Sequence, residues 1–176
     1  MSAIVIDTNV LLVASGQAAQ MSDACRKVCY QRLDRASARE QVVVDNQFLI
    51  LHEYQNKLDP RRRPPSPGGE FVLHVLRNMA NPAKVSTVNL TPTNSERTSF
   101  AEFPPDSVLE AAFDPADRKF VAASYAHAER PPIVESADSK WLGWEGRLKT
   151  HNIHLEVLCR NELEAIRQAK LSKKDK

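Results

Sequence analysis

Three aspartates stand where a parallel α/β fold would bring their carboxylates together. Asp7 directly follows an apolar, β-branched run, and Asp138 closes the segment that follows a second such run. The carboxyl ends of parallel strands form the edge of a sheet at which ligands bind. Asp117 lies in the first turn of a helix for which Asp114 and Pro115 are start signals, and such helices begin at the same edge. We therefore expect the three carboxylates to converge on one edge of a sheet.

Carboxylates gathered in this way repel one another, and each is driven toward protonation unless a cation neutralises the cluster. Hard oxygen ligands at such density suit Mg²⁺ or Mn²⁺. These ions can activate water and stabilise the leaving oxygen of a phosphodiester, so the acids predict a metal-dependent hydrolase. Taken singly, Asp117 is equally well explained as an acid at a helix N-terminus and Asp138 as a helix cap. The coincidence of three acids on one edge favours the metal site.

The elements that must position these acids alternate between strand and helix. Apolar runs predict strands over residues 3–6, 41–44, 85–90, 133–135 and 153–158, and helical periodicity predicts helices between them. Strands separated by helices imply a parallel sheet of about five strands with helices on both faces, a three-layer α/β/α arrangement. A helix beginning at Asn46 would place Glu53 roughly 10 Å from the acidic edge, so geometry alone leaves its membership in the cluster open.

Local signals refine this outline. Residues 59–69, rich in proline and arginine, predict a loop. Residues 91–107 predict a polar excursion whose Phe100 and Phe103 pack back onto the body. Asn161 and Glu164 have the spacing of a capping box that would open the last helix.

Length and composition are those of one ordinary globular domain. The 176 residues are 42% hydrophobic and 26% charged, and no apolar run reaches the length of a bilayer-spanning helix. Three cysteines, an odd count, favour a reducing compartment, and the sequence predicts a cytoplasmic protein without a membrane segment. Cys25 and Cys29 lie four residues apart on an expected helix, where core packing explains them better than a shared metal ion does.

The positive charge is concentrated in two short segments. Residues 170–176 contain four lysines and one aspartate, and the remaining residues, 20 basic and 21 acidic, form a nearly neutral domain over 1–169. Arg61, Arg62 and Arg63 form the second cluster. Both segments predict non-specific contacts with nucleic-acid phosphates, and a solvated loop and a frayed end are the alternatives.

Four motifs in order resemble the PIN-domain nuclease family. They are IVIDTNVLL at the start, LHEY, DPADRKFVAAS and IVESADSKW, and together they span nearly the whole chain. The resemblance implies a Rossmann-like fold and an endoribonuclease that hydrolyses RNA with Mg²⁺ or Mn²⁺. It implies that Asp7, Glu53, Asp117 and Asp138 form the metal-binding and catalytic quartet, and that Asn9 and Ser136 brace it.

One departure from the family pattern keeps alternatives open. Many members have a further acid where this chain has Lys140, which is instead a candidate for nucleic-acid contact; Asp114 or Glu135 could compensate. One expectation is a VapC-like toxin that acts on RNA. Its partner would be an antitoxin or another protein, and it would assemble as a homodimer. A non-catalytic PIN-like module that binds RNA or protein is its main rival. A dehalogenase-type phosphatase would need a second aspartate at position 9, which is Asn9.

Overall fold

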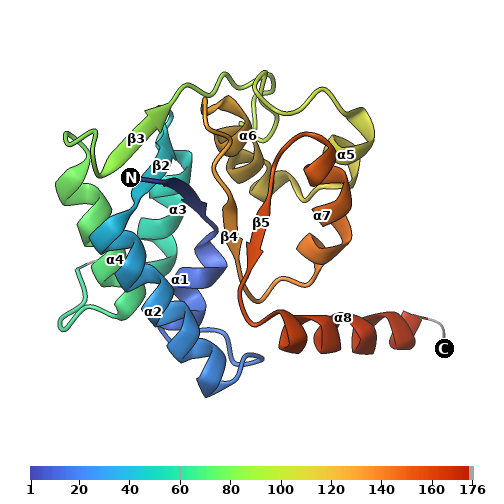
Figure 1. Ribbon diagram of the computed structural model, residues 1–176, viewed down its shortest axis with the longest axis horizontal. Coiled ribbons are helices and arrows are strands. Elements are labelled where there is room, and N and C mark those ends of the chain that lie inside the picture. Colours follow the sequence, from blue (N-terminus) through green and yellow to red (C-terminus); the bar gives the residue numbers. More distant parts are fainter. Residues whose placement is uncertain (60, 175–176) are drawn as a thin grey trace.

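An all-parallel sheet forms the centre of the protein (Figure 1). The computed structural model describes residues 1–59 and 61–174. Within them, five strands lie in the order β3-β2-β1-β4-β5. Their bounds are β1 Ala3–Ile6, β2 Gln41–Asp45, β3 Val85–Val88, β4 Ile133–Glu135 and β5 Leu155–Val157. The expected α/β class, the parallel pairing and the edge position of β3 are confirmed.

Helices cover both faces of this sheet. They are α1 Thr8–Ala14, α2 Asp23–Arg39, α3 Leu49–Leu58, α4 Pro67–Asn78, α5 Ser107–Ala112, α6 Arg118–Ala126, α7 Lys140–Thr150 and α8 Arg160–Lys174, with a 3₁₀ turn, η1 Pro115–Asp117, before α6. In Figure 1, α1 to α4 gather on one side of the sheet and α5 to α7 on the other. Helix α6 packs against β1, β2 and β4, which secures the second layer to the centre of the sheet. The result is a three-layer, Rossmann-like α/β/α fold.

The central strands form because their side chains can be buried on both faces. All four residues of β1 are buried, and β2 is buried from Val42 to Asp45. Continuous β-branched runs of this kind are typical of strands covered by helices on both sides. Since β1 lies between β2 and β4, the residue that follows it opens at the middle of the carboxyl edge.

The start of α3 differs from the expected helix over residues 46–58. Phe48 has a left-handed φ of 58°, so the helix begins at Leu49. The carboxylate of Asp45 accepts hydrogen bonds from the backbone amides of Leu49 and Ile50, both at 2.9 Å, and thereby caps the helix from the end of β2. This late start brings Glu53 closer to the carboxyl edge than a helix from Asn46 would.

Other boundaries also needed correction. Helix α4 begins at Pro67, with Ser66 as its cap, so residues 67–69 belong to a helix and not to the preceding loop. The capping box is wrong, because α8 begins at Arg160 and Asn161 is already inside the helix. Residues 107–112 form α5, which the sequence had not indicated. Helix α8 continues to Lys174, so the basic segment is helical as far as the structure describes it.

Two further features bear on the earlier expectations. Phe100 and Phe103 are buried, as expected of an excursion that packs back onto the domain. Cys25 and Cys159 form a disulfide, so the odd cysteine count no longer argues for a reducing compartment. Among the described residues, no helix has the combination of length and apolarity that crossing a bilayer requires.

Candidate metal centre

The carboxyl edge of the sheet brings together the aspartates that the sequence had singled out. Asp7 follows β1 and caps α1, Asp117 ends η1, and Asp138 follows β4 by three residues. The carboxylates of Asp114, Asp117 and Asp138 offer oxygens that all lie within 4.8 Å of one another. The negative charge of Asp7 is close enough to raise the pKa of Asp117. The expected convergence of these carboxylates is present in the fold.

Glu53 also lies at the acidic edge, although the helix length expected from the sequence had left its place there undecided. Its Oε1 accepts a hydrogen bond from Thr8 Oγ1 at 2.5 Å, and its Oε2 pairs with Lys119 Nζ at 2.5 Å. Thr8 is the neighbour of Asp7, so these bonds connect α3 directly to the residue that follows the central strand. Glu53 raises the pKa of both Asp7 and Asp117 through its charge.

Asp7 is the most constrained of the acids. Its side chain is 2% exposed, and its Oδ1 accepts a hydrogen bond from the backbone amide of Asn9 at 2.9 Å. Its Oδ2 is also buried and accepts no hydrogen bond from an amide or a basic side chain of the described residues, but the carboxyl of Glu135 lies within hydrogen-bonding reach of Asp7. The buried carboxylate of Asp7 therefore depends on a proton shared with Glu135, and a bound cation would stabilise it in place of that proton.

Glu135 is a buried neighbour of Asp7. Its Oε1 accepts a hydrogen bond from the backbone amide of Asp138 at 2.9 Å and so shapes the loop after β4. Burial and the charge of Asp7 raise the pKa of Glu135 well above its ordinary value. A protonated Glu135 can donate to Asp7, whose pKa this interaction lowers. The pair thus keeps one proton in a region that would otherwise hold two adjacent buried charges.

The acids at the edge are only partly neutralised. Burial is the largest cause that raises the pKa of Asp7 to about 6 and that of Asp117 to about 7, and the neighbouring carboxylates add to both shifts. Lys119 lowers both pKa values, but not enough to restore the ordinary ones. Near neutral pH the site therefore carries unfavourable negative charge, which a divalent cation would relieve.

Two lysines contribute positive charge to this edge. Lys119 is 7% exposed, and its ammonium contacts both Glu53 and the carbonyl oxygen of Ala116. Lys140 Nζ pairs with Asp114 Oδ2 at 2.5 Å. This exposed ion pair offsets part of the charge of Asp114, so Asp114 is a weaker candidate ligand than the buried Asp7. Sequence reasoning missed Lys119; its only signal was its place in the first turn of the helix that follows Asp117.

The predicted supporting residues act differently from one another. Asn9 supports Asp7 through its backbone amide. Ser136 is buried and makes its side-chain contact with Cys29 Sγ at 3.3 Å, so it braces the loop after β4 against α2 and not against a carboxylate. Arg61, Arg62 and Arg63 follow the far end of α3, about 15 Å along its axis from its start. The structure does not bring these three arginines to the acidic edge.

A basic groove adjoins the site instead. A cavity of about 710 Å³ lies between α7 and α8. Asp114 and Lys140 line its end at the acidic edge, and Trp144 supplies an aromatic wall. Helix α8 contributes its cationic side chains Arg167, Lys170, Lys173 and Lys174. The C-terminal lysines that were expected to contact phosphates thus lie beside the carboxylates, on a helix.

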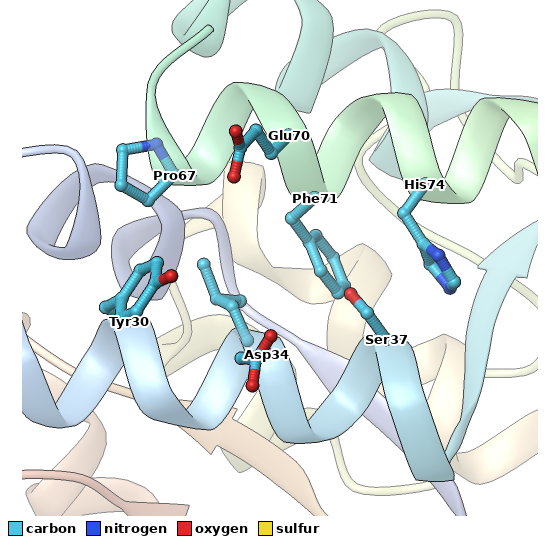
Figure 2. Close-up of a pocket in the computed structure, with 8 residues that line it drawn as sticks. Tyr30, Asp34, Ser37, Pro67, Glu70, Phe71 and His74 are labelled. Atoms are coloured by element: carbon cyan, nitrogen blue, oxygen red, sulfur yellow. The ribbon is translucent and has the colours of Figure 1, made fainter.

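A second hollow lies away from the acids. It has a volume of about 220 Å³ and separates α2 from α4. Figure 2 shows Tyr30 and Asp34 from α2 facing Pro67, Glu70 and His74 from α4 across it. None of the carboxylates at the sheet edge lines this hollow, so it has no part in the site above.

Comparison of the chain with protein-family models, with curated proteins and with solved structures finds no match. The α/β/α fold and the acidic edge therefore define the class of the protein: a Rossmann-like domain with a carboxylate cluster at the topological centre of its sheet.

Proposed function

We propose that the protein is a metal-dependent ribonuclease that hydrolyses RNA phosphodiester bonds with Mg²⁺ or Mn²⁺. The observation that carries this proposal is the gathering of Asp7, Glu53, Asp117 and Asp138 at one sheet edge with incompletely neutralised charge. The resemblance of four sequence motifs to PIN-domain nucleases supports the same four residues. A toxin-type endoribonuclease, with an antitoxin as partner, is the narrower form of this proposal.

The residues fit a hard divalent cation. The donor set is carboxylate oxygen, which Mg²⁺ and Mn²⁺ prefer. The buried carboxylate of Asp7 is met by the carboxyl of Glu135 and not by a basic group of the described residues, and burial together with the charges of neighbouring carboxylates raises the pKa of Asp117. When bound, such an ion supplies an activated water and electrostatic stabilisation of the leaving oxygen.

The protein's own groups would prepare this chemistry. Thr8 and Lys119 fix the orientation of Glu53 from opposite sides, and the Asn9 amide fixes Asp7. Fixed carboxylates lose little conformational entropy when they bind an ion. The groove between α7 and α8 presents cations beside the acids, where the phosphates of a bound RNA strand would be attracted.

Substitution of Asp7 by asparagine tests the proposal. Asp7→Asn keeps the size of the side chain and its bond to the Asn9 amide but removes the negative charge that Asp7 contributes to the cluster. We expect single-turnover cleavage of labelled RNA in Mn²⁺ to fall at least about 100-fold, the order of loss seen when one electrostatic catalytic group is removed. Circular dichroism checks the fold, and Asp34→Asn, which removes an exposed acid beside the α2–α4 hollow, is the matched control.

Two results would overturn the assignment. A folded Asp7→Asn protein that cleaves at the wild-type rate would show that the cluster is not the catalytic site. A pure wild-type protein that binds RNA but never cleaves it, in any divalent metal, would favour the binding-module alternative.

One observation favours the second candidate, a non-catalytic module that binds RNA. Lys140 occupies the position of a family acid and pairs with Asp114, which lowers the negative charge available to a second ion. A non-catalytic module that binds RNA would use the α7–α8 groove without the metal. In that case Lys140→Ala should weaken RNA binding in the presence of a chelator, and no condition should restore cleavage.

A further inference from the structure

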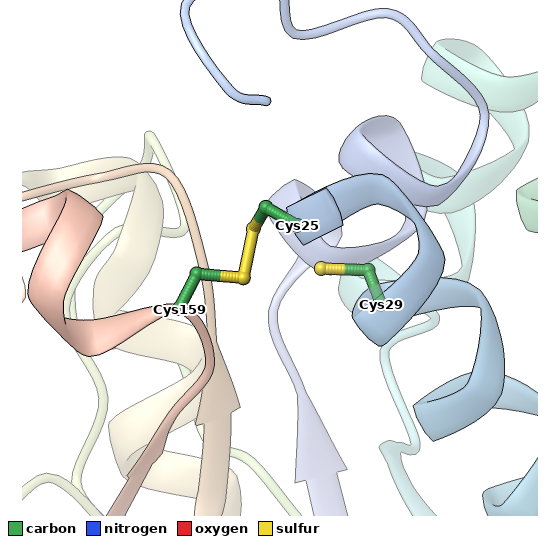
Figure 3. A group of neighbouring side chains, drawn as sticks. All are labelled: Cys25, Cys29 and Cys159. Atoms are coloured by element: carbon green, nitrogen blue, oxygen red, sulfur yellow. A yellow bond between two sulfur atoms is a disulfide. The ribbon is translucent and has the colours of Figure 1, made fainter. Parts of the chain in front are cut away.

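Three cysteine sulfurs converge behind the acidic edge. Cys25 and Cys29 lie one turn apart on the same face of α2, and Cys159 immediately precedes α8 (Figure 3). Their sulfur atoms all lie within 4.8 Å of one another. Cys25 and Cys159 are joined as a disulfide across 134 residues of sequence, while Cys29 remains a free thiol.

The free thiol is enclosed next to the bonded pair. Cys29 is fully buried, and burial raises its pKa to about 11. Its Sγ contacts Ser136 Oγ at 3.3 Å, and the carboxylate of Glu162 is near enough to disfavour the thiolate. A thiol in these surroundings is a poor nucleophile at neutral pH, because the reactive form is the thiolate. A role as a ligand that a metal ion deprotonates suits it better.

We propose that reduction of the Cys25–Cys159 bond converts this cluster into a binding site for a thiophilic ion of the Zn²⁺ class, held by Cys25, Cys29 and Cys159. A dithiol reductant delivers two electrons and two protons to the two sulfurs and is itself oxidised to a disulfide. Zn²⁺ then displaces one proton from each of the three thiols to solvent. Oxidation withdraws two of the three ligands, so occupancy depends on the redox state.

The spacing of the sulfurs suits such an ion. With Zn–S bonds of about 2.3 Å, a tetrahedral site holds its sulfurs about 3.8 Å apart. Sulfurs already within 4.8 Å need only small rotations of their side chains to meet that distance. Three protein ligands with an open fourth position are a common zinc arrangement. The carboxylate of Glu162, which accepts hydrogen bonds from the Ser22 amide at 2.6 Å and the Ser22 hydroxyl at 2.8 Å, is close enough to Cys29 to affect the charge of its thiol.

This site is chemically separate from the carboxylate cluster. Thiolates select Zn²⁺ and softer ions, whereas carboxylates suit Mg²⁺ and Mn²⁺. The inference does not rest on the proposed ribonuclease activity, and it holds or fails whether or not the protein cleaves RNA.

The test uses the full chain in two redox states. Protein reduced with a phosphine under anaerobic conditions and untreated oxidised protein are each titrated with Zn²⁺ against a chromophoric chelator, and with Cd²⁺, whose thiolate complexes absorb in the ultraviolet. We expect the reduced protein to bind one ion per chain with thiolate absorbance, and the oxidised protein to show no such absorbance. Asp117→Asn, which alters only the carboxylate cluster, should leave the absorbance unchanged.

Cysteine variants identify the ligands. Cys29→Ala should weaken Zn²⁺ binding to the reduced protein by more than about 100-fold, beyond the loss seen when only a group supporting a ligand is removed. Cys159→Ser, at a partly exposed position before α8, provides a second variant if the first fails to fold. The proposal is overturned if the reduced protein shows no thiolate absorbance, or if either folded variant binds Zn²⁺ as tightly as the reduced wild type.

Discussion

The charge at the acidic edge makes a quantitative prediction for Asp117→Asn in the metal-free protein. The carboxyl of Asp117 has its pKa raised from 3.8 to about 7 by burial and by the charges of Asp7, Asp138 and Glu53. Asparagine has nearly the same shape and never ionises. The substitution should therefore leave the fold intact and remove one source of repulsion.

The sign and size follow from linkage between proton binding and folding. Because the folded-state pKa lies above the unfolded one, the folded protein binds the extra proton, and the stability this provides is complete below about pH 4. It is lost as the pH rises through about 7. At 1.36 kcal/mol per pKa unit, the rise in the pKa of Asp117 from 3.8 to about 7 corresponds to a loss of at most about 4 kcal/mol of unfolding free energy. Part of this loss belongs to the interaction with Asp7 and not to Asp117 alone. Asp117→Asn should thus be more stable than the wild type at pH 8 by about 2–4 kcal/mol, and close to it at pH 4.

Urea denaturation with a chelator present, at pH values from 4 to 8, measures this difference. Addition of Mn²⁺ at pH 8 should stabilise the wild type and reduce the gap, because the ion performs the neutralisation that the substitution mimics. Asp34→Asn serves as the control for removal of one negative charge elsewhere. If wild type and Asp117→Asn lose stability in parallel between pH 5 and 8, the carboxylates do not repel one another measurably, and the predicted gain in stability is refuted.

Three further substitutions test a counter-ion of the site and the space around two glycines. Lys119→Met removes the cation that pairs with Glu53, so the free energy of unfolding of the metal-free protein should fall by about 1–3 kcal/mol. Mn²⁺ should then raise the melting temperature of the variant by more than it raises that of the wild type. An equal increase in the two proteins would contradict the role of Lys119 as a counter-ion. Gly68→Ala should cost about 1–3 kcal/mol in urea denaturation, since an added Cβ would lie 2.7 Å from the Leu11 carbonyl oxygen. Gly146→Ala, where an added Cβ meets nothing within 4 Å, should instead stabilise by up to about 1 kcal/mol, and equal effects at the two glycines would refute the packing argument.

Strand burial and topology made much of this fold predictable. Strands β1, β2 and β4 lie in the interior of the sheet, where helices cover both faces, so their sequences are continuous apolar runs rich in β-branched residues. Such runs can be recognised in the sequence alone. Asp7 and Asp138 could be placed because parallel strands share a carboxyl edge. Their convergence needed only the order of the elements, not the details of packing.

The remaining features depend on tertiary contacts that local sequence does not encode. The position of Glu53 follows from a left-handed turn at Phe48 and from bonds to Thr8 and Lys119, residues far from it in the chain. The Cys25–Cys159 bond joins residues 134 positions apart. The basic C-terminal segment looked like a tail because most of its residues are charged and Leu171 alone is apolar, yet lysine is a good helix former and α8 extends into it as far as Lys174.

The central position of β1 has a consequence for how the chain is assembled during synthesis. The first 88 residues supply β1, β2 and β3, together with Asp7 and Glu53, but leave one edge of β1 unpaired. That edge is filled only by β4, which emerges with the second half of the chain, between Asp117 and Asp138. Neither half contains the whole quartet, so the acids meet only when the two halves have docked along β1. Formation of the site is thereby tied to completion of the sheet.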